Sequence, residues 1–154
     1  MEQIKKLIKE ILKEMSFGDI GISIKKDNSL KDKELLMINV DMDPKQARYF
    51  IKENGIGLNA LQHLLRVLIF KNKPEQTFFT LDINNYRKER EEFLTDLALK
   101  TAQRVRRNKK PVVLEPMSAY ERRFIHLKLA EQSDIVTESI GEEPERKVVV
   151  RLYP

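Results

Sequence analysis

Apolar and polar positions alternate along the chain with two different periods, which divide its first part into helices and strands. Apolar residues recur every three or four positions from Ile4 to Met15, which predicts an amphipathic helix. Alternation over 20–24 and an apolar run over 35–40 predict two strands that pair as a hairpin. Asp43-Pro44 combines an N-cap residue with proline at the first helical position, so we expect a helix that reaches about Lys52.

Two glycines, Gly55 and Gly57, separate this helix from a second one. The second helix should reach about residue 70, because leucines form one stripe along it, at Leu58, Leu61, Leu65 and Leu68. Residues 78–83 are typical of a third strand. The first part of the chain therefore has the order helix, strand, strand, helix, helix, strand.

The second part of the chain shows the same two periods in a different order. The predicted elements are a long helix over 86–108, a short strand over 112–114, a helix from Pro116 or Ser118 to about Ala130, and a hairpin of strands over 135–140 and 147–152. We place the boundary near Asn84, which gives an α+β protein with domains 1–84 and 85–154.

The charge is distributed unevenly, although the net charge is only +5. Residues 100–110 contain six basic residues and no acid, whereas residues 131–145 contain six acids and no base. A concentrated basic segment suits nucleic acid, because each neutralised phosphate releases condensed counterions. The alternative is a solvated helix end whose cations are favoured by the helix dipole.

No pattern in the chain specifies catalysis. The sequence has no Cys and two His far apart, and no common catalytic or phosphate-binding motif occurs. Disulfides and thiolate metal sites are therefore excluded, and we expect no catalytic residue, metal site or cofactor. The segment from Met1 to Met15 is too interrupted by charge to span a membrane or to act as a signal peptide, so we expect a cytoplasmic protein.

The segment Pro116–His126 places Arg122 and His126 four residues apart, on one face of a helix. Apolar residues at helical spacing lie on roughly the opposite side and should form the core: Met117, Tyr120, Phe124 and Leu127. Arg122 and His126 are then expected to point outward, where they could bind a phosphate or stack on a base. The alternative is a surface arginine beside a partly packed histidine.

Several motifs in order resemble a known family. They are Tyr86-Arg87 with Arg90-Glu91, Arg104-Val105-Arg106-Arg107, Leu114-Glu115-Pro116-Met117, Tyr120-Glu121-Arg122-Arg123 with His126, and Gly141-Glu142-Glu143-Pro144. This series closely resembles the R-3-H domain of the Jag (also KhpB, SpoIIIJ-associated) family of bacterial RNA-binding proteins. The first part of the chain is similar to the type II KH domain of that family in its element order (αββααβ) and in Leu58-Asn59-Ala60-Leu61-Gln62.

The resemblance implies binding of single-stranded RNA, or of RNA with some duplex character, without catalysis. Single-stranded DNA is a further candidate ligand. It assigns the R-3-H role to Arg122 and His126. On electrostatic grounds we add Arg104, Arg106, Arg107 and Arg123, which should bind phosphate without reading sequence. We expect the chain to lack the small N-terminal domain that many Jag proteins carry.

The alignment places the KH phosphate-binding loop, G-x-x-G, at Lys52-Glu53-Asn54-Gly55. The first glycine is replaced by Lys52, and Glu53 adds a negative charge where a phosphate should lie. Lys52, Asn54 and Gly55 stay candidate nucleic-acid-binding residues, and Gly57 would supply a neighbouring flexible point for a shifted loop.

Two interpretations of this altered loop stay open. In one, the KH domain still binds RNA weakly, with help from basic residues at Arg48, Lys52, Lys71 and Lys73. In the other, it is a scaffold that docks a protein through His63, Arg66 and Phe70. The candidate partners are then another KH protein, the ribosome or cell-envelope machinery.

Overall fold

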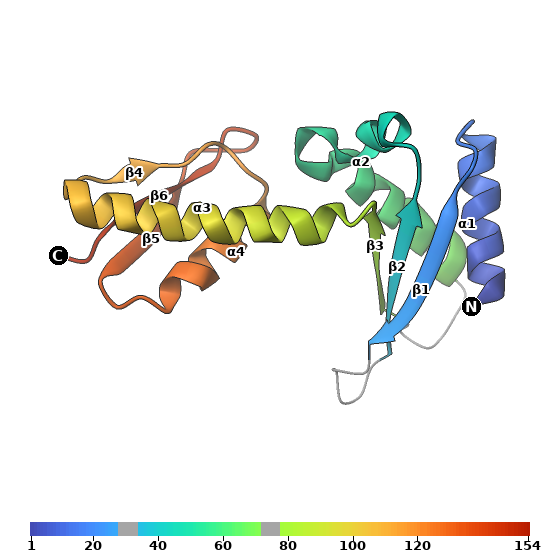
Figure 1. Ribbon diagram of the computed structural model, residues 1–154, viewed down its shortest axis with the longest axis horizontal. Coiled ribbons are helices and arrows are strands. Elements are labelled where there is room, and N and C mark those ends of the chain that lie inside the picture. The colour runs from blue at the N-terminus through green and yellow to red at the C-terminus, as the bar shows by residue number, and fades with distance from the viewer. Residues whose placement is uncertain (28–33, 72–77) are drawn as a thin grey trace. The chain divides into compact units, whose positions relative to one another are not determined.

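The computed structural model describes residues 1–27, 34–71 and 78–154 (Figure 1). The chain divides into two compact units, Met1–Arg87 (unit 1) and Lys88–Pro154 (unit 2). Each unit has its own three-stranded sheet and its own apolar core, so the predicted α+β class is confirmed. Within the described ranges, no helix is both long enough and apolar enough to cross a membrane.

The described residues of unit 1 form two helices and a mixed sheet. Its elements are α1 (Glu2–Glu14), β1 (Gly21–Asp27), β2 (Leu35–Asp41), α2 (Pro44–Phe70) and β3 (Phe78–Ile83). The central strand β2 pairs antiparallel with β1 and parallel with β3. Alternate residues of β2, such as Ile38 and Val40, are buried in one core with Ile8 of α1 and Leu58 of α2. The strand period therefore gives this sheet one buried face and one exposed face.

Helix α2 is interrupted where the sequence predicts a turn between two helices. Lys52 has a non-helical ψ of 161°, and three successive residues then have left-handed backbone, with φ of 53°, 58° and 79° at Glu53, Asn54 and Gly55. The turn thus lies at Lys52–Gly55. Its left-handed conformation suits glycine but is uncommon for the two residues before it.

Gly57 has a packing role beside this turn. A Cβ at this position would lie 2.7 Å from the carbonyl oxygen of Tyr49 and 2.8 Å from the Cα of Phe50. The glycine therefore lets the second helical segment of α2 approach the backbone of the first. The turn is not shifted toward Gly57, so the idea of Gly57 as a flexible point of a shifted loop is wrong.

The leucine stripe of the second segment is only partly internal. Leu58, Leu61 and Leu65 are buried, as predicted, but Leu68 is 53% exposed. Two further apolar residues, Leu64 and Val67, are also exposed along this segment. The buried face of the second segment of α2 therefore contains fewer apolar residues than the sequence pattern indicates.

A network of side-chain hydrogen bonds connects α2, β3 and the start of α3 where the chain leaves unit 1. The amide side chain of Gln62 accepts the backbone N–H of Leu81 at 2.9 Å, and Arg87 Nε donates to the Leu81 carbonyl at 2.8 Å. Asp82 accepts the backbone N–H of Arg87 at 3.0 Å. The motif residues of α2 and of the β3–α3 connection therefore stabilise each other across the edge of β3.

Unit 2 packs one long helix and one short helix on an antiparallel sheet. Its elements are α3 (Tyr86–Asn108), whose first two residues belong to unit 1, β4 (Val112–Val113), α4 (Ala119–Ala130), β5 (Ile135–Ile140) and β6 (Lys147–Leu152). The strand order is β4-β6-β5, and β5 and β6 form the predicted hairpin. Residues from both helices and from β6 are fully buried together, including Leu94, Ala98, Ile125 and Val148.

Candidate nucleic-acid interface

Helix α4 presents a different face to the core than its apolar pattern predicts. Arg122 is only 7% exposed, whereas Tyr120 and Leu127, which we expected in the core, are 58% and 60% exposed. Met117, by contrast, is buried as expected. The expectation that Arg122 points outward is therefore wrong.

A polar contact to α3 explains this orientation. Ser118 and Glu121 form a reciprocal capping box at the start of α4, and Glu121 also accepts a charge-assisted bond from Arg90 Nε at 2.6 Å. Glu121 is 4% exposed, so its carboxylate needs these partners. The pair holds Glu121 of α4 against α3, while Tyr120 stays exposed and its hydroxyl donates to Glu91 of the same helix α3.

Arg122 connects the start of α4 to the loop between β5 and β6. Its Nη1 donates to the carbonyl oxygen of Met117 at 2.8 Å, and its Nη2 lies 2.8 Å from Oε1 of Glu143. Its Nε is buried and has no hydrogen-bond partner within the described residues. The guanidinium thus acts as a brace between two segments of unit 2.

His126 connects α4 to β5 through both ring nitrogens. Nδ1 lies 2.6 Å from the hydroxyl of Thr137, and Nε2 lies 2.9 Å from the hydroxyl of Ser139. Burial lowers the pKa of His126 below its ordinary value, and the positive charge of Arg122 lowers it further. The neutral ring, which donates from one nitrogen and accepts at the other, matches the two hydroxyls.

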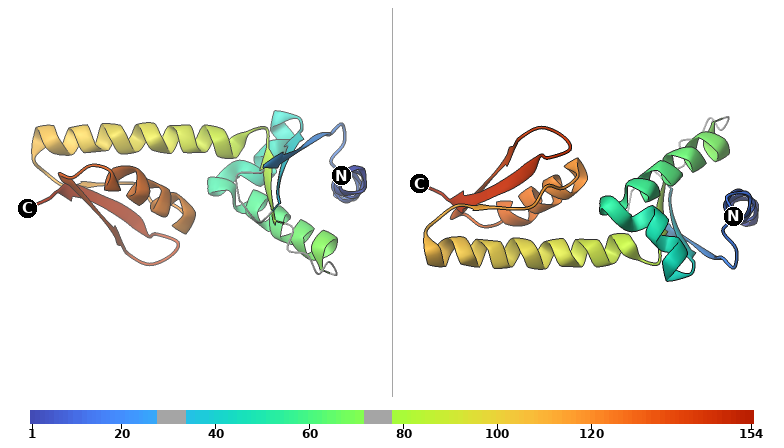
Figure 2. Two further views of the ribbon diagram at one scale, coloured as in Figure 1. Left: turned by 90° about the horizontal axis from the view of Figure 1, so that it is seen from below. Right: turned by 90° about the horizontal axis from the view of Figure 1, so that it is seen from above.

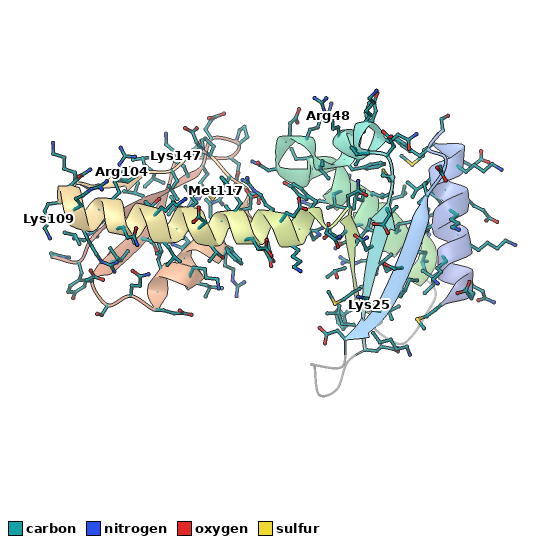
Figure 3. The ribbon with its side chains drawn as sticks, viewed as in Figure 1. Lys25, Arg48, Arg104, Lys109, Met117 and Lys147 are labelled. Carbon is teal, nitrogen blue, oxygen red and sulfur yellow. The ribbon has the colours of Figure 1, made fainter. Side chains whose placement is uncertain are left out.

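The end of α3 carries a group of exposed cations of unit 2. Arg104 and Arg107 are exposed on the last turns of the helix, and Lys109 and Lys110 follow it. Figure 3 labels Arg104 and Lys109 of this group. None of the four has an ion pair within the part of the chain that the structure describes. We call these four residues the cationic end. A phosphate could approach each of them without displacing an internal carboxylate.

Arg106 differs from its neighbours on α3, because its guanidinium is bound by Asp134 and Gln132 of the same unit. Nε lies 2.6 Å from Oδ2 of Asp134, Nη2 lies 2.7 Å from Oδ1, and Nη2 also donates to Gln132. The hydrogen bond from Arg106 is the largest cause of a lowered pKa at Asp134. This bidentate pair fixes the segment before β5 to the end of α3.

The other predicted binding residues belong to other elements than α3. Arg123 is exposed on α4. In unit 1, Lys52 and Asn54 are exposed on the turn of α2, as is Arg48 on the segment before it (Figure 3). Lys71 is exposed, whereas Lys73 and the side chain of Phe70 lie outside the described residues.

Gly55 is the least accessible residue of the predicted phosphate-binding loop. It is buried, and a Cβ there would lie 3.0 Å from the ring of Tyr86. The aromatic ring therefore covers the side of Gly55 where the absence of a side chain would otherwise admit a phosphate. Lys52 stays exposed, with its Nζ 5.9 Å from the centroid of the Tyr49 ring.

Sequence reasoning missed the partners of the motif residues. Thr137 and Ser139 are two apart on a strand, so the period of two already placed them on one face. It did not show that this face meets His126. Glu143 belongs to one of the motifs of the family, but its contact with Arg122 spans α4 and the β5–β6 loop. Only the fold brings these groups together.

Comparison with known proteins gives two kinds of match. Residues 92–152 match the family model of the R-3-H domain, so unit 2 contains an R-3-H domain. The chain is also similar to curated proteins named "RNA-binding protein KhpB". It is 36% identical over 134 residues to that of Clostridium symbiosum, covering 87% of this chain and 59% of the relative. It is 36% identical over 108 residues to that of Bacillus subtilis, covering 69% of this chain and 52% of the relative.

A third relative extends the same pattern. The KhpB protein of Lactiplantibacillus plantarum is 34% identical over 113 residues, which is 73% of this chain and 35% of the relative. The chain thus spans between about a third and about three fifths of the length of these relatives. The matches support the relationship to KhpB proteins that the sequence motifs indicate.

Proposed function

We propose that this chain is a non-enzymatic protein that binds single-stranded RNA through the cationic end of α3. The observation that carries the proposal is the set of four exposed cations, Arg104, Arg107, Lys109 and Lys110, which have no ion pair among the described residues. They belong to the unit that matches the R-3-H domain. The printed names of the curated relatives support RNA as the ligand.

The chemistry of this surface favours the backbone of RNA over its sequence. Arginine and lysine at a helix end neutralise phosphates and release counterions, which gives affinity without base readout. The Arg106–Asp134 pair keeps the end of α3 fixed to the segment before β5, so the free cations project from a rigid base. The binding should therefore be strongly dependent on salt.

In this proposal, Arg122 and His126 have a structural role: they stabilise the packing of α4 in unit 2. Arg122 ties α4 to the β5–β6 loop, and His126 ties it to β5. Direct contact of either residue with RNA stays a prediction from the resemblance. Contact of a phosphate with Nη2 of Arg122 would compete with the carboxylate of Glu143.

We also propose that unit 1 is a KH domain of type II with a minor role in RNA binding. Its strand pairing and the break of α2 at Lys52–Gly55 support this assignment. The exposed Lys52 and Arg48 supply positive charge beside the turn. The covered Gly55 and the acid Glu53 argue that this turn binds phosphate less well than the cationic end.

The proposal is tested with a charge variant and a control of equal charge. Arg104→Gln/Arg107→Gln removes two cations of the cationic end, and Lys9→Gln/Lys13→Gln removes two exposed cations of α1. Fluorescence anisotropy with a labelled single-stranded RNA is measured at several salt concentrations. The site variant should bind more weakly, and its plot of log K against log salt should be shallower by about 1.4, because each single-strand phosphate contact contributes about 0.7.

The control decides whether position matters. Lys9→Gln/Lys13→Gln should retain the wild-type slope, since α1 is in the other unit. Equal weakening by both variants would mean that only net charge matters, and an unchanged site variant would remove the cationic end from the binding surface. If the wild-type protein has no affinity for RNA, the proposed function is wrong.

A protein-docking adaptor is the second candidate function, and an exposed apolar face favours it. Leu64, Val67 and Leu68 of α2 are 41%, 43% and 53% exposed and lie at helical spacing. His63 and Arg66 are exposed nearby on the same segment. Light scattering before and after ribonuclease treatment discriminates the two functions. RNA-independent oligomers that Leu64→Lys disrupts would favour the adaptor.

A further inference from the structure

Tyr153 is an exposed aromatic residue directly after β6. It is 68% exposed, the largest fraction among the aromatic side chains of the described residues. Its backbone is nevertheless fixed, because its N–H donates to the carbonyl oxygen of Asp134 at 2.8 Å. An ordered backbone with a free ring is the arrangement that a stacking platform requires.

Asp134 brings Tyr153 to the cationic end. The carboxylate of Asp134 binds Arg106 of α3 through two hydrogen bonds, and the carbonyl of the same residue binds Tyr153. Lys109 is close enough to Asp134 to contribute electrostatically to the lowered pKa of that carboxyl. The end of the chain accordingly lies beside the last turn of α3 in Figure 1 and in both views of Figure 2.

We propose that Tyr153 stacks on an unpaired base of the nucleic acid whose phosphates the cationic end binds. The inference rests on the proposed function and specifies its ligand as a single strand with accessible bases. Single-strand binders combine a cationic track for the backbone with aromatic rings for the bases, and every base offers a π-face to such a ring. Tyr153 therefore adds affinity for single strands without adding a sequence preference.

Stacking and phosphate binding have different signatures, which allows each to be tested separately. Loss of an aromatic stacking contact lowers affinity by about 5- to 150-fold and leaves the salt slope unchanged, because no counterion is released at the ring. Loss of a cation makes the slope shallower. A duplex hides its base faces, so Tyr153 should contribute nothing to binding of double-stranded RNA.

The experiment compares Tyr153→Leu and Tyr153→Phe in the full chain, with Tyr120→Leu as the matched control. Tyr120 is 58% exposed in the same unit, but its hydroxyl donates to a carboxylate, Glu91, at 2.5 Å. The probes are a single-stranded RNA, the same strand with abasic sites, and a duplex of equal length. Circular dichroism confirms that each variant is folded.

The expected result is specific to the ring and to the base. Tyr153→Leu loses about 5- to 150-fold in affinity for the single strand, whereas Tyr153→Phe and Tyr120→Leu retain it. Wild type binds the abasic strand as weakly as Tyr153→Leu binds the intact strand. Tyr153→Leu has the same affinity for the abasic strand as for the intact strand. The duplex is bound equally by wild type and Tyr153→Leu.

Three outcomes overturn the inference. If Tyr153→Leu binds the single strand as wild type does while Arg104→Gln/Arg107→Gln binds it weakly, the stacking proposal fails and the proposed function stands. If Tyr153→Leu weakens binding of the abasic strand as much as that of the intact strand, the residue does not act through a base. If wild type binds no RNA, the stacking proposal fails together with the proposed function.

Discussion

Replacing Gly57 with alanine tests the packing of the turn in α2, because two effects of opposite sign meet at this position. In an ordinary helix, alanine is more favourable than glycine by about 1 kcal/mol. Here the added Cβ would lie 2.7 Å from the Tyr49 carbonyl oxygen and 2.8 Å from the Phe50 Cα. Both atoms belong to the backbone, so neither can rotate away.

The steric overlap should decide whether Gly57→Ala stabilises or destabilises unit 1. Forcing an extra carbon into a packed site costs about 1 to 3 kcal/mol, and contacts this short with backbone belong at the upper end of that range. After the gain in helix propensity is subtracted, we expect Gly57→Ala to lower the free energy of unfolding of unit 1 by about 1 to 2 kcal/mol. Gly18→Ala is the matched control, since a Cβ there meets no atom within 4 Å.

Native-state hydrogen exchange measures this effect for each unit separately. Exchange of the buried β2 amides, such as Ile38 and Val40, reports unit 1, and exchange of Val148 and Val150 in β6 reports unit 2. Gly57→Ala should speed exchange in β2 by about 5- to 30-fold and leave β6 unchanged. Unchanged or slower exchange in β2 would refute the reasoning, because helix propensity would then outweigh the contact.

Three further predictions concern the polar contacts of unit 2. Ser118→Ala removes one half of the capping box with Glu121, so it should lower the free energy of unfolding by about 0.5 to 2 kcal/mol in urea titrations. The lowered pKa of His126 means that the folded state binds its proton less readily, so stability should fall as pH drops below about 6.5, and His126→Gln should flatten that part of a stability–pH profile. The lowered pKa of Asp134 likewise gives stability that is present above about pH 4 and is lost as pH falls further, an effect that Asp134→Asn should remove and that salt should weaken. Unfolding midpoints that do not depend on pH in either range would contradict both assignments.

The elements of the fold were predictable from the sequence because the apolar positions of helices and of strands recur with clearly different periods. The alternation over 20–24 and the three-to-four spacing in α1 each point to one kind of element, and both are found. The turn at Lys52–Gly55 was also predictable, since glycine and polar residues interrupt an apolar helix pattern there.

The orientation of α4 was not predictable from the same reasoning. This helix has apolar residues on both faces, with Tyr120 and Leu127 on one side and Ile125 and Leu129 on the other. Periodicity cannot choose between two apolar faces. The choice follows from the partly buried pair of Glu121 with Arg90, which lies 31 positions earlier on another helix. A long-range polar contact therefore overrides the local apolar pattern.

The basic run of α3 shows that the environment of charged residues also depends on long-range contacts that the sequence pattern does not reveal. Arg104, Arg106 and Arg107 are equivalent in the sequence, and the run indicates a phosphate surface for all three. In the fold, Arg106 is bound to Asp134, which lies 28 positions away, while its two neighbours are exposed. The division of one basic run into a paired arginine and an exposed, proposed binding surface depends on a partner that composition does not identify.

This division determines how a loss of RNA binding must be interpreted. An Arg122→Ala/His126→Ala variant removes the brace to Met117 and the contact with Thr137 along with any RNA contact. Weaker binding by that variant identifies an RNA contact only if hydrogen exchange in β5 and β6 is unchanged. Lys109 and Tyr153 lie outside the motifs of the family and are exposed, so substitutions there change the surface while leaving the core of unit 2 intact.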